Sequence, residues 1–134
     1  MTGNWVQWLR QVLSSAADCL DVVSQHCYQD RASEVISQMN GVGGMMRSAG
    51  QGNKPLWLTE TGWSTAKMSE HEQDEGYGGL LQSLASSDMA KVFFNELADD
   101  PRSDDQFGIL HRDLTSKRAY ETYRQFIAGQ APSV

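Results

Sequence analysis

A glutamate placed between two tryptophans is the clearest candidate for chemistry in this sequence. Glu60 ends the apolar run of residues 54–60, with Trp57 shortly before it and Trp63 shortly after it. A carboxylate can act as a nucleophile or as a general acid or base. Indole rings stack on the apolar faces of sugar rings, whose hydroxyl groups need acceptors such as a carboxylate. The combination favours a saccharide site over the alternative, a solvated or helix-capping glutamate.

Two further groups of polar residues stand near the ends of runs that are rich in β-branched or aromatic residues. His26 and Tyr28 end the run of residues 21–28, and Asn95 and Glu96 fall near the end of residues 90–97. A histidine in such a place often serves structure alone, which is the alternative interpretation of His26. Together with Glu60, these residues form the set from which a site could be built.

The elements that must position these side chains alternate along the chain. The spacing of apolar residues predicts strands over residues 21–28, 54–60 and 90–97, and helices over residues 4–20, 32–48, 69–86 and 116–128. Such alternation indicates an α/β fold with parallel strands. Reactive groups in parallel sheets lie at the carboxyl ends of the strands, so we expect the candidate residues to meet at one edge. Gly76, Gly78 and Gly79 are expected to weaken the third helix.

Residues 55–63, PLWLTETGW, resemble the seventh strand of retaining glycoside hydrolases with (β/α)₈ barrels, the clan of cellulases and β-xylosidases. Residues 21–28 are similar to the sixth strand of that clan, with its H-x-Y motif, and residues 92–100 to its eighth strand. Residues 107–110 and 117–120 resemble the segment that closes the barrel. The resemblance implies a partial TIM barrel, in which three parallel strands alternate with four helices.

The resemblance also implies roles for individual residues. Glu60 matches the catalytic nucleophile, and Tyr28 matches the tyrosine that donates a hydrogen bond to it. We expect substrate contacts from His26, Tyr28, Asn95 and Glu96, and also from Trp63, which would lie near the rim of a sugar subsite. In this clan the general acid/base is the glutamate of an Asn-Glu pair at the end of the fourth strand. Asn95-Glu96 has the same residue types but stands in the eighth-strand position, so we interpret the match as coincidence. The alternative is that Glu96 approaches Glu60 with both side chains pointing inward, since adjacent parallel strands lie ~4.8 Å apart.

The function implied is hydrolysis of β-linked saccharides with Glu60 as nucleophile, weak or lost in isolation because the acid/base strand is missing. The alternatives are a carbohydrate-binding or protein-interaction module without catalysis, or a truncated remnant. Leu56 and Leu58 are expected to share the face of Glu60, because side chains alternate along a strand. An apolar face of this kind would be uncovered in a monomer, and we therefore expect a homodimer.

Composition and charge exclude several other classes of protein. The 134 residues carry a net charge of −6 without a basic block, so we expect no nucleic-acid partner. We expect no membrane partner either, and the lack of a signal-peptide pattern suggests a cytoplasmic protein. Cys19 and Cys27 are expected to be buried thiols. We predict one domain over residues 1–128 and a frayed tail over residues 129–134.

No motif in the sequence indicates a cofactor or a metal ion. The aspartates at positions 99, 100, 104 and 105 lack the ligand spacing and central glycine of an EF-hand calcium loop, so we expect a solvated acidic loop. Neither a nucleophile elbow nor a complete dinucleotide-binding loop is present.

Overall fold

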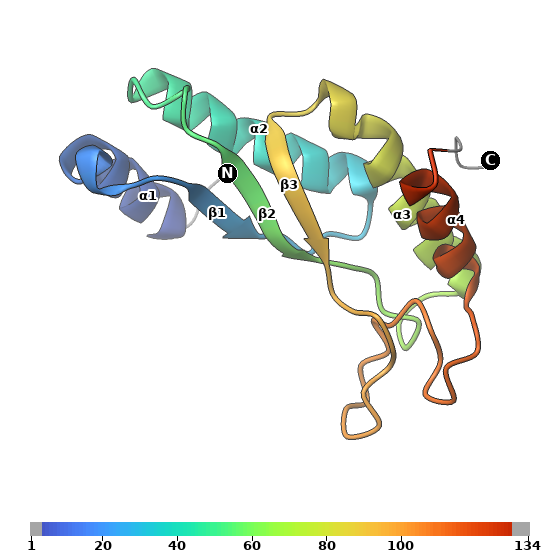
Figure 1. The fold of residues 1–134 in the computed structure, drawn as a ribbon. Coiled ribbons are helices and arrows are strands. Elements are labelled where there is room, and N and C mark those ends of the chain that lie inside the picture. Colours follow the sequence, from blue (N-terminus) through green and yellow to red (C-terminus); the bar gives the residue numbers. More distant parts are fainter. Residues whose placement is uncertain (1–3, 130–134) are drawn as a thin grey trace.

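The alternating pattern of the sequence folds into three parallel strands and four α-helices in the computed structural model, which describes residues 4–129 (Figure 1). In chain order the elements are α1 (Asn4–Ser15), η1 (Ala17–Cys19), β1 (Val23–His26), α2 (Ala32–Ser48), β2 (Leu56–Thr61), α3 (Glu70–Ser83), η2 (Leu84–Ser86), β3 (Met89–Phe94) and α4 (Arg118–Ile127). The predicted α/β class and partial-barrel topology are confirmed. Of the predicted tail, only Gly129 lies within the described residues.

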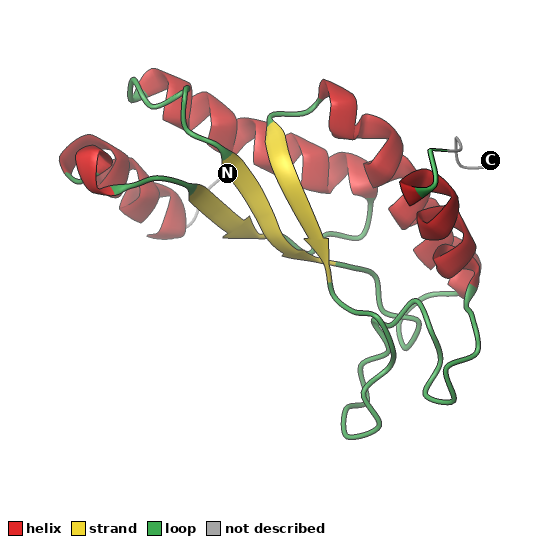
Figure 2. Cartoon of the chain, in the orientation of Figure 1, coloured by secondary structure: helices red, strands yellow, loops and turns green. Residues whose placement is uncertain are grey.

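The sheet has the order β1-β2-β3, and both pairs of neighbours are parallel. Strands that follow one another along the chain are thus neighbours in space, as in a βα-barrel. The loops at the carboxyl ends of the strands gather on one side of the molecule, and the longest connects β3 to α4 (Figure 2).

The hydrophobic core lies between one face of the sheet and the helices. Val35, Met39 and Val42 of α2 are fully buried and belong to the same cluster as Leu58 of β2 and Leu80 of α3. α1 adds Val6, Leu9 and Leu13 to this core, whereas Trp8 of the same helix is 64% exposed. No helix within residues 4–129 has the length and hydropathy needed to cross a bilayer.

A bulge in β2 corrects the predicted face of two leucines. Gln25 pairs with Leu58, but the next residue of β1, His26, pairs with Glu60, so β2 contains one extra residue at this point. A bulge of this kind interrupts the alternation of side chains between the two faces. Leu56 and Leu58 are therefore buried in the core, while Glu60 is turned to Tyr28 and His26. The prediction that both leucines share the open face with Glu60 was wrong.

The two cysteines differ in their surroundings. Both are free thiols, but only Cys27, which follows β1 directly, is buried in the hydrophobic core, whereas Cys19 is exposed at the end of η1. The prediction of two buried thiols was wrong for Cys19. Burial raises the pKa of the Cys27 thiol to about 11, so this thiol is unreactive at neutral pH.

Candidate active site at the carboxyl ends of the strands

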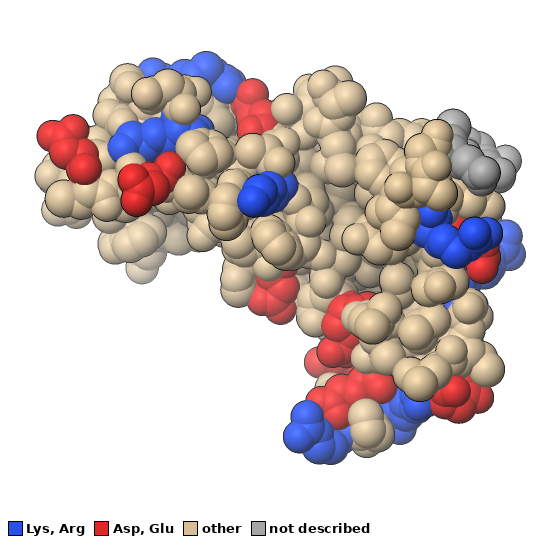
Figure 3. Space-filling model, in the orientation of Figure 1, with Lys and Arg blue, Asp and Glu red and all other residues tan. Residues whose placement is uncertain are grey.

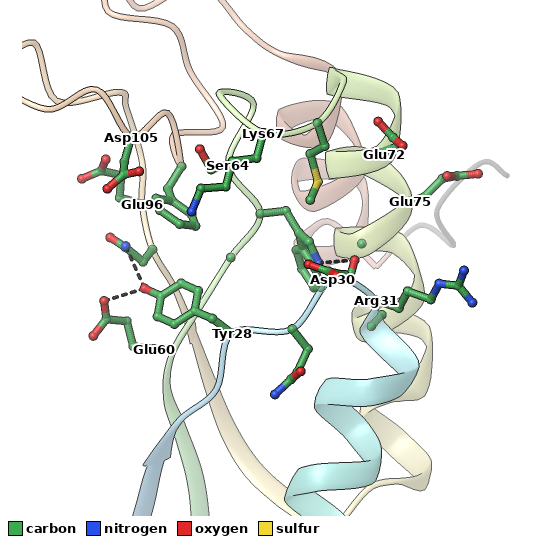
Figure 4. Close-up of a pocket in the computed structure, with 18 of the residues that line it drawn as sticks. Tyr28, Asp30, Arg31, Glu60, Ser64, Lys67, Glu72, Glu75, Glu96 and Asp105 are labelled. Atoms are coloured by element: carbon green, nitrogen blue, oxygen red, sulfur yellow. Dashed lines mark hydrogen bonds between the residues drawn. The ribbon is translucent and has the colours of Figure 1, made fainter.

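Four of the residues predicted for the site come together where the three strands end. His26 is the last residue of β1, Glu60 is the second-last residue of β2, and Asn95 follows β3 directly. Tyr28 lies just beyond β1, and its side chain reaches Glu60 and Asn95 (Figure 4). The parallel arrangement places these ends at one edge of the sheet, as the sequence predicted.

The carboxylate of Glu60 is held at both of its oxygens. The hydroxyl of Tyr28 donates a hydrogen bond to Oε1 at 2.5 Å, and Nδ1 of His26 lies 2.8 Å from Oε2. The predicted contact between Tyr28 and Glu60 is therefore present. These two contacts restrict the rotation of the carboxylate. A fixed orientation favours its action as a nucleophile or as a general base.

Tyr28 is itself positioned by two neighbours. The side-chain amide of Asn95 donates a hydrogen bond to the hydroxyl oxygen at 2.9 Å, and the ring of Phe107 packs edge-on against the Tyr28 ring at a centroid distance of 5.3 Å. Burial and the hydrogen bond to Glu60 raise the pKa of Tyr28 to about 12, although Asn95 acts in the opposite direction. The hydroxyl therefore stays protonated at neutral pH and remains a donor to Glu60.

Gly62 allows the ends of β2 and β3 to approach each other closely. The backbone N–H of Asn95 donates to the carbonyl oxygen of Thr61 at 2.7 Å. A Cβ at Gly62 would overlap the carbonyl oxygen of Asn95, so only glycine fits there without a shift of the backbone. The glycine of the T-E-T-G-W motif thus serves the packing that brings Asn95 to Tyr28.

An open cleft of about 1320 Å³ is lined by Tyr28, Glu60 and Asn95, though not by His26, and it also receives side chains from α3 and from the long loop after β3. Figure 4 shows Tyr28 and Glu60 on one side of this cleft and the acidic side chains of α3 on the other. Clefts of this kind are the usual place for ligands in parallel α/β sheets.

Trp63 corrects one part of the predicted site. It borders the cleft, but its side chain is only 1% exposed. The indole N–H donates to the carbonyl oxygen of Asp30, and the ring packs against Tyr77 of α3. Gly76 gives the ring this space, since a Cβ there would collide with it. Trp63 therefore supports the strand end from inside the core, and its ring is not available for stacking on a sugar.

Glu96 lines the same cleft as Glu60. Its carboxylate makes neither a hydrogen bond nor an ion pair with any other residue of the described part of the chain. The peptide bond between Asn95 and Glu96 is cis. Glu96, which was predicted as a substrate contact, lies in the lining of the cleft.

A buried ion pair beside the cleft was missed at the level of sequence. Nζ of Lys117 lies 2.9 Å from Oδ1 of Asp99 and donates to the hydroxyl of Thr65, and both charged side chains are almost completely buried. Asp99 also accepts a hydrogen bond from the N–H of Gly108. The predicted solvated acidic loop was therefore wrong for Asp99, because a lysine distant in sequence covers it. Within residues 4–129, no group of His, Cys, Asp and Glu side chains is arranged to hold a metal ion.

Several solved structures that match this arrangement of elements are glycosidases. The glucosidase of Croceicoccus marinus matches 86% of this chain with a TM-score of 0.69 and 17% identity, and the monomeric β-xylosidase of Caulobacter crescentus CB15 matches 90% with a TM-score of 0.69 and 13% identity. The β-galacturonidase of Eisenbergiella tayi, solved with bound galacturonate, matches 85% with a TM-score of 0.64 and 18% identity. At these identities the likeness shows the fold.

The chain spans only about a quarter to a third of the length of these proteins, namely 26%, 31% and 24% in the same order. No curated protein matches the sequence. The sequence does match the family described as glycosyl hydrolase catalytic core, over residues 1–108. Because this match covers most of the 134 residues, the chain belongs to the glycosyl hydrolase catalytic core family.

Proposed function

We propose that this chain carries the nucleophile of a retaining glycosidase that cleaves β-linked saccharides, and that Glu60 is that nucleophile. The observation that supports the proposal best is the carboxylate of Glu60, held by Tyr28 at 2.5 Å and by His26 at 2.8 Å in an open cleft. A carboxylate fixed in this way at a strand end can meet an anomeric carbon along a defined direction.

In the reaction proposed here, a carboxylate oxygen of Glu60 forms a bond to the anomeric carbon as the bond from that carbon to the leaving oxygen breaks. The leaving oxygen takes a proton from a general acid. Water, deprotonated by the same group, then releases the sugar from Glu60. His26, Tyr28, Asn95 and Glu96 are proposed to contact the substrate, because all four lie around the Glu60 carboxylate or in its cleft.

The mechanism also needs a general acid, and the resemblance does not place this group on β1, β2 or β3. A retaining enzyme needs a second carboxyl group roughly 5–5.5 Å from the nucleophile. The resemblance assigns that group to a fourth-strand glutamate, which is not among the strands described here. We therefore propose that these 134 residues alone turn over unactivated saccharides weakly or not at all.

Covalent trapping tests the nucleophile without requiring the general acid. A dinitrophenyl fluoroglycoside has a leaving group that needs no proton, and its fluorine slows hydrolysis of the adduct. Incubation with the protein should add the mass of one fluorosugar, and peptide mapping should place the adduct on Glu60. Glu96→Gln should still be labelled, whereas Glu60→Gln should not.

Three results would contradict the proposal. Labelling at another carboxylate would transfer the role of nucleophile to that residue. If no labelling occurs and saccharides nevertheless change the tryptophan fluorescence, the chain is a carbohydrate-binding module. The absence of labelling and of binding would favour a remnant of the fold without saccharide chemistry.

A further inference from the structure

We infer that the cleft selects saccharides without carboxylate groups, and that it binds a protonated amino sugar more tightly than the matching neutral sugar. The inference rests on the proposed saccharide site around Glu60 and names the class of substrate that the site accepts. It follows from the charges that surround Glu60 in the cleft.

Acidic side chains reach the cleft from four parts of the fold. α3 contributes Glu72 and Glu75, the loop after β3 contributes Glu96, Asp100 and Asp105, and Asp30 follows β1. Glu60 of β2 adds a further carboxylate at the strand ends. In the space-filling view, acidic side chains gather over the loops at the carboxyl ends of the strands, with basic side chains beside them (Figure 3). Asp100 is paired with Arg102, and Glu72 accepts hydrogen bonds from Ser69, so these two carboxylates already have partners within the protein.

Two of these carboxylates have no cationic partner within residues 4–129. Neither Glu96 nor Asp105 forms an ion pair with any residue in the described range 4–129. The charge of Glu96 also acts at the centre of the site, where it adds to burial and to Glu60 in raising the pKa of Tyr28. An ammonium group on a sugar would find partners here, whereas a carboxylate would be repelled.

Only two cationic side chains, Arg31 and Lys67, are among the described residues that line the cleft. Figure 4 shows the guanidinium group of Arg31 pointing away from Glu60. Lys67 extends toward the part of the cleft that also carries Glu96 and Asp105. In that part, one positive side chain is therefore accompanied by two carboxylates. Arg31 is thus turned away and Lys67 has carboxylates beside it, so neither side chain offers a uronic acid a cationic partner without competition.

The test compares binding of three trisaccharides with identical linkages, built from glucose, glucosamine or glucuronate. NMR titration of the protein at about pH 6, where the amines and the carboxylates are both charged, gives the three dissociation constants. We expect the glucosamine trisaccharide to bind best and the glucuronate trisaccharide to bind at least about tenfold more weakly than the glucose trisaccharide. High salt should reduce both differences.

A double variant, Glu96→Gln with Asp105→Asn, removes the two unpaired charges from side chains that are not in the core. It should bring the three dissociation constants closer together, because it removes two of the charges that distinguish the three ligands. The control, Glu121→Gln on α4, removes a carboxylate that lies outside the cleft and should change none of the three.

The outcomes separate this inference from the function on which it rests. If the glucuronate trisaccharide binds as well as the glucose trisaccharide, or if the double variant leaves the order and the ratios unchanged, the inference is wrong and the proposed saccharide site stands. If none of the three binds, the saccharide site itself is wrong.

Discussion

Glu60, Tyr28, His26 and Asn95 form a connected set of hydrogen bonds rather than a group of independent ligands. Asn95 donates to Tyr28, Tyr28 donates to one oxygen of Glu60, and His26 faces the other oxygen. The Tyr28 hydroxyl keeps its proton at neutral pH, because burial and Glu60 raise its pKa to about 12. The orientation of the Glu60 carboxylate should therefore not change with pH through loss of this donor below about pH 10.

The first prediction concerns Tyr28→Phe. This change removes the donor at 2.5 Å from Glu60 and leaves the ring that packs against Phe107. A hydrogen bond to a charged group contributes about 1.5–3 kcal/mol, so trapping of Glu60 by the activated fluoroglycoside should slow by about tenfold to a hundredfold. The rate of mass increase gives the result. Tyr120→Phe on α4 is the matched control, and an unchanged rate in Tyr28→Phe would show that Tyr28 does not orient the nucleophile.

At the scale of the element, the glycines of α3 were expected to weaken this helix, and the structure separates their roles. A Cβ at Gly76 would meet the buried ring of Trp63, whereas a Cβ at Gly78 would only touch the methyl group of Thr122 at 3.7 Å. Gly76 is thus required by the contact between α3 and the end of β2. Gly78 has room for a side chain.

The second prediction uses this difference. Gly78→Ala should stabilise the protein by roughly 0.5–1 kcal/mol, because alanine favours the helix and meets no obstacle. Gly76→Ala should destabilise it by about 1–3 kcal/mol, because Trp63 is enclosed and cannot move away freely. Urea unfolding of both variants measures the two free energies. Equal effects of the two changes would show that Trp63 does not depend on Gly76 for its place.

The third prediction concerns the ion pair between Lys117 and Asp99, which connects the start of α4 to the loop after β3. Lys117→Met leaves the buried Asp99 without its partner and should cost about 3–5 kcal/mol of unfolding free energy. Adding Asp99→Asn should restore part of the lost stability. It removes the unpaired charge, and the side-chain oxygen of the asparagine can still accept a hydrogen bond from the N–H of Gly108.

Denaturant unfolding of Lys117→Met, of Asp99→Asn and of the double variant gives the coupling energy between these two residues. Arg124→Gln, which breaks an exposed ion pair with Glu121, should have a far smaller effect. If Asp99→Asn makes the Lys117→Met variant less stable still, the two charges do not act as a pair.

For the whole molecule, the sheet has one face in the core and one face that no helix within residues 4–129 covers (Figure 1). The uncovered face differs from the predicted one, because Leu56 and Leu58 are buried. Trp57 packs against Phe93 instead, and Phe93 remains 48% exposed. Parallel sheets are almost always covered on both faces, so this side is a candidate for contact with a second chain.

The fourth prediction is therefore that the 14.9 kDa chain self-associates at micromolar concentration through this face, and a two-fold dimer is the expected form. Light scattering should give twice the monomer mass. Phe93→Ser should shift the equilibrium to monomer, while Phe126→Ser on α4 should not. A monomer at every concentration tested would show that the exposed ring does not drive association.

The sequence by itself determined the order and type of the elements and the residues that meet at the strand ends. Local patterns carry this information, since periodicity distinguishes helix from strand and parallel strands bring their carboxyl ends to one edge. The helix predicted over residues 32–48 is the observed α2 (Ala32–Ser48), and the T-E-T-G-W and H-x-Y motifs placed Glu60 beside Tyr28.

The tertiary structure alone decided which side chains face the cleft and which face the core. The bulge that separates Glu60 from Leu58 depends on pairing between β1 and β2, which no local pattern in β2 reveals. Trp63 is buried because α3 offers a glycine at the point of contact, and Asp99 is buried because Lys117 reaches it from the start of α4. Each of these contacts joins residues far apart in the chain, so each exists only once the elements have packed.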